Sequence, residues 1–284
     1  MNRTSLVAVT QGMGGISPED GPDEAGSQEP IPGTKRDALI WMLVAGVGFI
    51  VGGILSQVGV VAWGLASGVG SASRLARLES SAMPPEGLVL CNLVGLWVGL
   101  IGAALAVSRL RGTRRFAKDM GLAIRLWPDV PLGLVAGAML QFVVIPVLYV
   151  PFIHLIPNFK HQFSRPAERI SGASHGNGVL LLALFVAVIA PIVEEIFFRG
   201  VLMRSLEGLS RSAGRFVSWM VPVVGSALLF GLAHFEPLQF MGLVVLGLVL
   251  AIIARRTRRL GLGIVAHAAF NGFALFEFFH VHLG

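Results

Sequence analysis

Long apolar stretches constrain this chain more than any other feature of its sequence. A helix needs about 20 mainly apolar residues to cross the hydrocarbon core of a bilayer, and seven stretches come close to that length. Hydrophobic residues make up 54% of the chain and charged residues only 13%, which lies outside the range of ordinary soluble domains. The sequence predicts an all-α, polytopic transmembrane helix bundle of about seven spanning helices, near 38–66, 87–107, 130–155, 179–206, 216–234, 238–254 and 260–280.

Three parts follow from this pattern. Residues 1–34 are rich in Gly, Pro, Ser and acid, and we expect a disordered N-terminal tail. Its longest apolar run, LVAV, is too short for the apolar core of a secretory signal, so we expect the tail to be retained. Residues 35–125 hold the first two transmembrane helices and a basic loop, and residues 126–284 hold the rest. Cys91 is the only cysteine, which excludes an intrachain disulfide and a cysteine metal cluster.

The basic residues predict the orientation, because Lys and Arg are retained in short cytoplasmic loops. With the N-terminus in the cytoplasm, the outer loops receive few of them and the inner loops receive most: Arg109, Arg111, Arg114, Arg115, Lys118, Arg125, Arg204, Arg211, Arg215, Arg255, Arg256, Arg258 and Arg259. The excess of Lys and Arg over Asp and Glu is then explained by the membrane topology and by attraction to anionic lipid headgroups. Dispersed basic residues without interleaved aromatic residues argue against a nucleic-acid partner.

The apolar fourth stretch contains three charges, in PIVEEIFFRG. Ionisable residues at bilayer depth are costly and normally mark function. Glu195 and Arg199 stand at i and i+4, the spacing of a helical ion pair. Glu194 points about 100° away around the same helix and has no basic partner within one turn. A lone carboxylate of this kind is available as a general base, although a charge pair that anchors the helix at the inner surface is an equally simple reading.

Two further stretches carry polar side chains at bilayer depth. His234 ends the fifth stretch, one turn after Phe230, while His267 and Asn271 lie at i and i+4 on the seventh. A single such histidine is usually a hydrogen-bonded packing residue, but acid, imidazole and amide groups from three helices together indicate one polar pocket. Counting residues places His267 nearer the inner surface and His234 nearer the outer one. The sixth stretch is short for a full span, so the turn before it would lie below the outer surface. His234, which precedes this turn, would then lie deeper in the membrane and closer to His267.

These motifs, Glu194-Glu195-x-x-x-Arg199, Phe230-x-x-x-His234 and His267-x-x-x-Asn271, resemble those of the CPBP family of intramembrane proteases. The family includes type II CAAX prenyl endopeptidases and bacteriocin-processing or abortive-infection proteases. The resemblance covers roughly residues 130–280. It implies an intramembrane endopeptidase that hydrolyses a peptide or membrane-associated protein, and it places the chain in a bacterial plasma membrane.

The resemblance also implies roles for these residues. Glu194 would take a proton from the attacking water, which His234 would hold and polarise. His267 and Asn271 would donate hydrogen bonds to the oxyanion, and Glu195 with Arg199 would support the site. This preferred mechanism requires no cofactor. Zinc held by Glu194, His234 and His267 is the alternative, since two histidines and a carboxylate form a known catalytic zinc set.

Two other classes of function stay open at this level. Buried acids and histidines also serve ion pathways in transporters, although the sequence shows no inverted repeat. A membrane scaffold or immunity protein would need no catalysis. The substitution Glu194→Gln separates the three, because a protease loses cleavage, a transporter changes its flux and a scaffold keeps its activity.

Overall fold

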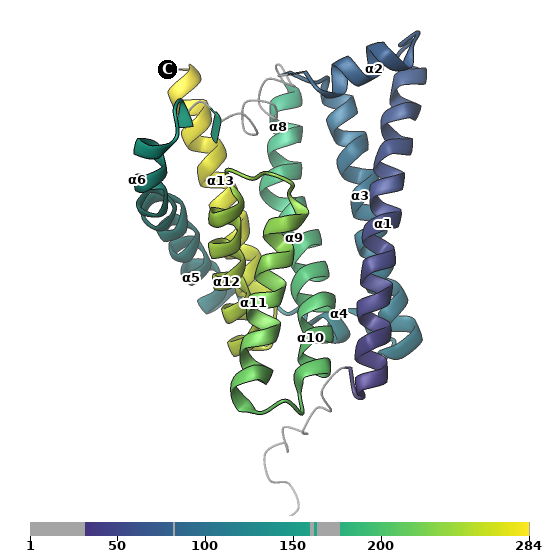
Figure 1. Ribbon diagram of the computed structural model, residues 1–284, viewed down its shortest axis with the longest axis vertical. Coiled ribbons are helices and arrows are strands. Elements are labelled where there is room, and N and C mark those ends of the chain that lie inside the picture. The colour runs from purple at the N-terminus through teal and green to yellow at the C-terminus, as the bar shows by residue number, and fades with distance from the viewer. Residues whose placement is uncertain (1–31, 82, 160–161, 164–176, 284) are drawn as a thin grey trace, which may run out of the picture. The chain divides into compact units, whose positions relative to one another are not determined.

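The computed structural model describes residues 32–81, 83–159, 162–163 and 177–283. In these ranges every regular element is a helix, which confirms the predicted all-α class (Figure 1). Residues Ile31–Gly284 form one compact unit. The predicted tail at 1–34 lies outside the described residues except for its last three. The helices are α1 Lys35–Ala66, α2 Ala72–Glu79, α3 Glu86–Arg111, α4 Phe116–Met120, α5 Leu126–Met139, α6 Ile145–Leu155, α8 Asn177–Leu184, α9 Ala190–Glu195, α10 Met203–Ser210, α11 Arg215–Ala233, α12 Phe240–Thr257 and α13 Gly261–Leu283.

Six helical segments of the described chain are long and apolar enough to cross a membrane. They begin and end within a few residues of the first six predicted stretches. The seventh stretch forms α13, of which residues Gly261–Glu277 count as a shorter apolar helix. Together with the exposed side chains, these segments make the protein an integral membrane protein. On α1, Leu43, Val47 and Ile54 are each more than half exposed, which only a lipid environment explains for so many neighbours.

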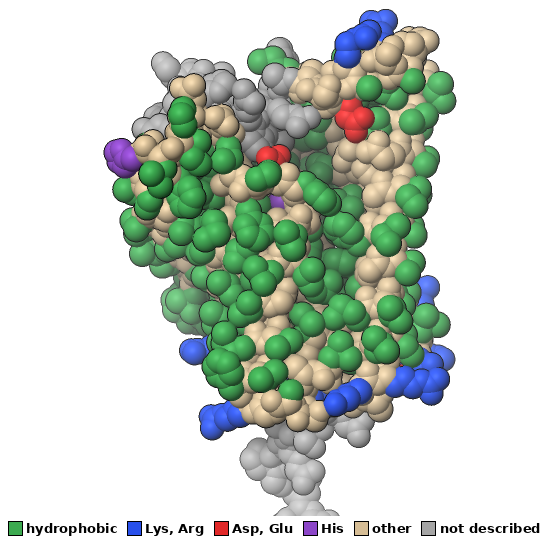
Figure 2. Space-filling model, in the orientation of Figure 1, with side chains coloured by type: hydrophobic (Ala, Val, Ile, Leu, Met, Phe, Trp, Pro, Cys, Tyr) green, Lys and Arg blue, Asp and Glu red, His purple; other side chains and the backbone are tan. Residues whose placement is uncertain are grey.

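The surface has the charge distribution of a membrane protein. Figure 2 shows hydrophobic side chains over the flank, and Lys and Arg side chains gathered mainly at the end where α1 begins. A smaller basic group lies at the opposite end, over α2. This distribution is the one that the loop arginines predict, although the side of the membrane on which each end lies stays a prediction.

Glycines allow α1 and α3 to pack closely along their length. A Cβ atom added to Gly52 would lie 2.7 Å from the Leu96 carbonyl oxygen, and one added to Gly59 would lie 2.8 Å from that of Cys91. Small residues permit such close approach of helices in lipid. This pair contacts the rest of the bundle where α1 packs against α10 and against the π-helical segment η3, Ile196–Leu202.

A hairpin of two short helices reaches only part of the way across the bundle. In Figure 1 the turn between α11 and α12 lies below the upper ends of α1, α8 and α13. The two helices have 19 and 18 residues, whereas α1 has 32. His234 caps the first of them, so the shallow turn brings its side chain toward the interior of the bundle.

Candidate active site

The fourth spanning segment, which carries the EEIFFR motif, is interrupted by two π-helical segments. It runs through α8, the π-helical segment η2 at Phe185–Ile189, α9, η3 and α10. Glu194 and Glu195 are the last residues of α9, directly before η3. A π segment inserts an extra residue into a helical turn and is often found at functional sites. These changes alter the direction of the side chains around the two glutamates.

Glu195 and Arg199 form a completely buried ion pair. The Arg199 Nη1 atom donates to Glu195 Oε1 at 2.8 Å, and neither side chain is exposed to solvent. Arg199 also donates through Nη2 to the Gly247 carbonyl on α12 at 3.1 Å. Its guanidinium carbon lies 4.6 Å from the centre of the Phe230 ring, within the range of a cation–π contact. The pair therefore joins the motif helix to α11 and α12.

His267 lies between the two glutamates. Its Nδ1 atom is 3.2 Å from Glu195 Oε1, and its Nε2 atom is 3.7 Å from Glu194 Oε2. Because the carboxylate can only accept, Nδ1 carries the hydrogen and Nε2 is directed at Glu194. A carboxylate that fixes a histidine in this way sets both its tautomer and its orientation. Glu195 is thus a partner of His267 as well as of Arg199.

Glu194 differs from its neighbour in its access to solvent. Its side chain keeps 19% of its surface exposed, whereas the Glu195 and His267 side chains are buried. Among the described residues, His267 is the only ion-pair partner of Glu194. This contact comes from α13 and not from the helix that carries Glu194.

His234 approaches the same region through Phe230. Its Nδ1 atom lies 2.8 Å from the Phe230 carbonyl oxygen, to which it donates, so Nε2 is the free ring nitrogen. The Phe230 ring lies 4.7 Å from the His234 ring and 5.6 Å from the His267 ring, measured between ring centres. One aromatic side chain therefore contacts both imidazoles and the guanidinium. From the sequence, Phe230 could be identified only as a motif residue, and its contacts with both imidazoles could not be predicted.

Asn271 lies one turn beyond His267 on α13. Its Nδ2 atom donates to the Val186 carbonyl oxygen in η2 at 3.0 Å. An amide nitrogen carries two hydrogens, so one remains available for another acceptor. The bond fixes the side chain and ties α13 to the first π segment.

A zinc site of the kind expected from the resemblance needs three ligands around one point. Within the part of the chain that the structure describes, no group of three His, Cys, Asp or Glu side chains is arranged to hold a metal ion. Glu194 and His267 are neighbours, but His234 does not join them as a third ligand. The donor set in this conformation therefore does not fit zinc with three protein ligands, and no step is assigned to a metal here.

The segment that holds the candidate site is similar to known proteins. Residues 176–273 match the family described as type II CAAX prenyl endopeptidase Rce1-like. The chain is also 30% identical over 99 residues to the membrane-embedded CAAX protease MroQ of Staphylococcus aureus (strain USA300). That match covers 34% of this chain and 38% of the relative. No solved structure matches the chain. The segment that matches the family contains all three motifs, so both comparisons agree with the family resemblance that the motifs carry.

Proposed function

We propose that this protein is an intramembrane endopeptidase that hydrolyses a peptide or a membrane-associated protein with water activated by Glu194. The observation that carries the proposal is the 3.7 Å approach of His267 Nε2 to Glu194 Oε2 beside the buried Glu195–Arg199 pair. The Rce1-like match and the similarity to a CAAX protease support the same class of reaction. The chain spans 38% of that relative, so the activity is inferred from this site.

Glu194 is proposed as the general base because its side chain is accessible to water and lies beside His267, whose position is fixed by Glu195. Its side chain keeps 19% of its surface exposed, so water can reach it. Among the described residues its ion-pair partner is His267 and not an arginine, which leaves the carboxylate able to accept a proton. It takes a proton from water while the water oxygen bonds to the scissile carbonyl carbon. When the carbon–nitrogen bond breaks, that proton passes to the leaving amine. General bases of this kind contribute about 10²–10⁴-fold to a rate.

The other polar groups act on the water and the oxyanion. His234 has its free Nε2 atom for the attacking water. Two groups on one face of α13 are proposed to donate to the carbonyl oxygen, where negative charge develops: the second amide hydrogen of Asn271, and His267 Nε2 when the ring carries a second proton. Donors that are held in place before the reaction stabilise such a charge strongly. Glu195 and Arg199 position His267 and do not touch the substrate.

The protein is proposed to lie in a bacterial plasma membrane with its N-terminus in the cytoplasm. The arginine-rich ends of α3 and α12 would then face the cytoplasm. A reporter fused before residue 35 and another fused into the α2 loop test this orientation.

Quantitative proteomics of membranes that carry the wild type or Glu194→Gln tests the activity. We expect a set of protein fragments that depends on Glu194. The matched control is Glu86→Gln, which removes a carboxylate at the start of α3, away from the site. Fragments that persist with Glu194→Gln, or that disappear equally with Glu86→Gln, would contradict the proposal. Chelator treatment of the purified protein tests the zinc alternative, and full activity after removal of bound metal is the result that we expect.

A further inference from the structure

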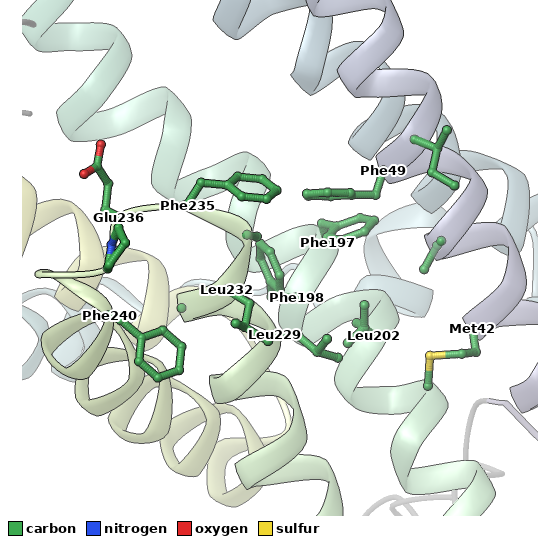
Figure 3. Close-up of a pocket in the computed structure, with 16 residues that line it drawn as sticks. Met42, Phe49, Phe197, Phe198, Leu202, Leu229, Leu232, Phe235, Glu236 and Phe240 are labelled. Atoms are coloured by element: carbon green, nitrogen blue, oxygen red, sulfur yellow. The ribbon is translucent and has the colours of Figure 1, made fainter.

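An apolar groove runs between α1 and the α11–α12 hairpin. Its volume is about 930 Å³, within the range of ligand-binding pockets. Figure 3 shows the walls, with Met42 and Phe49 on α1, Phe197 and Leu202 on η3, and Phe240 at the start of α12. Glu236 is the one ionisable side chain among the lining residues that the structure describes, and it lies in the turn at one end. The α1 wall lies outside the segment that matches the family.

The groove shares its walls with the candidate active site. Ala233 and Phe235 line it and flank His234 in the chain. Phe198 lines it as well, stands one helical turn after Glu194, and packs edge-to-face on Phe230 with 5.2 Å between ring centres. Phe230 in turn contacts both imidazoles. A molecule in the groove is therefore separated from the catalytic groups by a single layer of aromatic side chains.

Phe235 is held in a conformation that its residue type rarely adopts. Its φ angle is 53°, in the left-handed region, and its side chain is 80% exposed. A bulky residue there is an outlier whose strain is often connected with function. In Figure 3 the Phe235 side chain points across the groove toward Phe49, which packs on Phe197 with 6.4 Å between ring centres. These aromatic residues line the groove beside the turn that carries His234.

We propose that this groove binds an apolar segment of the membrane-anchored polypeptide substrate, with a basic residue of that substrate beside Glu236. The inference rests on the proposed function and specifies its substrate class. The occupant is polypeptide because only one layer of aromatic side chains separates the groove from the groups proposed to attack a peptide bond. The volume equals that of roughly six to eight helical residues. The single carboxylate at the rim selects a basic flanking residue by charge complementarity.

The chain itself offers no segment for this groove outside the described residues. Residues 1–31 contain no apolar run longer than the four residues LVAV. Two other molecules could occupy the groove, namely a second copy of the protein and the acyl chain of a free lipid. Each would displace a bound peptide.

Two glycines of α1 provide a matched pair of variants. Gly46 lines the groove and Gly53 does not, and a Cβ atom added at either position meets no atom within 4 Å. Gly46→Phe therefore fills the groove without a clash, and Gly53→Phe adds the same side chain to the same helix elsewhere. Both substitutions are made in the Glu194→Gln protein, so that binding is measured without cleavage.

The probe is a fluorescent synthetic peptide of eight alternating Leu and Ala residues flanked by Lys, added to protein in lipid nanodiscs that each hold one copy. We expect Gly46→Phe to raise its Kd about tenfold or more, a loss of about 1.4 kcal/mol, and Gly53→Phe to leave it unchanged. Glu236→Lys should weaken binding of the Lys-flanked peptide and strengthen that of a Glu-flanked one. Equal affinity in the two glycine variants would overturn the inference, as would displacement of the peptide by a fatty acid or by a second copy of the protein.

The outcomes separate this inference from the proposed function. If the peptide binds as expected but the wild type cleaves nothing, only the proposed protease activity fails. If the wild type cleaves substrates and Gly46→Phe cleaves them equally well, only the groove assignment fails.

Discussion

The Nδ1 atom of His267 lies 3.2 Å from the Oε1 atom of Glu195, the same oxygen that binds Arg199. One buried carboxylate oxygen thus fixes a guanidinium and an imidazole from two different helices. Glu195→Gln keeps the shape of the side chain and removes its charge, leaving Arg199 buried without a counterion. Loss of one partner from a buried pair costs about 3–5 kcal/mol. We expect a clear fall in the thermal unfolding temperature in nanodiscs, whereas Glu86→Gln should leave it nearly unchanged. Equal unfolding temperatures would contradict this structural role.

Arg199→Lys tests whether the shape of the guanidinium matters as well as its charge. Arg199 reaches Glu195 through Nη1 and the Gly247 carbonyl through Nη2, on separate helices. A lysine ammonium is a single point of charge and does not reproduce this fork. We expect the variant to keep the ion pair and to lose about 1–3 kcal/mol from the unpaired Gly247 carbonyl. Wild-type stability for Arg199→Lys would show that the bond to Gly247 contributes nothing.

The contact between α1 and α3 predicts opposite effects at two glycines of α3. A Cβ atom at Gly99 would collide with the backbone of Gly52, whereas a Cβ atom at Gly102 meets nothing within 4 Å. Gly99→Ala should therefore separate the helices and lower the unfolding temperature. Gly102→Ala should be neutral or slightly stabilising, because alanine favours a helix by up to about 1 kcal/mol over glycine. Similar unfolding temperatures for the two variants would contradict the close packing.

Tyr149 holds the beginning of α12, next to the turn that carries His234. Its hydroxyl oxygen accepts from the Gly242 backbone N–H at 2.9 Å, inside a cluster with Phe152, Phe159 and Phe163. Tyr149→Phe keeps the ring and leaves that buried N–H without its acceptor, at a cost of about 1–3 kcal/mol. We expect kcat to fall, because the turn that carries His234 shifts. An unchanged kcat would contradict the connection to His234.

Most of the membrane architecture could be predicted from the sequence, because an apolar run of sufficient length predicts each spanning helix. The Glu195–Arg199 pair was predictable for a similar reason, since its i, i+4 spacing is local. The contact between His267 and both glutamates depends on how two helices meet, which no local pattern gives. The motif resemblance indicated only that these residues belong to one site.

The three π segments and the groove had no sequence signal that we could use. Each π segment replaces one α-helical turn without a change in composition. One of them, η1 at Leu140–Val144, lies within the third predicted span, directly before α6. The α1 wall of the groove was outside the resemblance, so its part in the site became visible only from the packing of α1 on η3.

The most direct test of the central claim is a double-mutant cycle on Glu194 and His267. Glu194 is proposed to activate the water and His267 to stabilise the oxyanion in the same chemical step, so their effects on kcat should not multiply. Purified Glu194→Gln, His267→Ala and the double variant are compared in nanodiscs, on a substrate found by the proteomic comparison. We predict that each single variant loses about 10²–10⁴-fold in kcat and that the double variant is no slower than the slower single one. Losses that multiply in the double variant, or a Glu194→Gln protein that retains its kcat, would contradict the account.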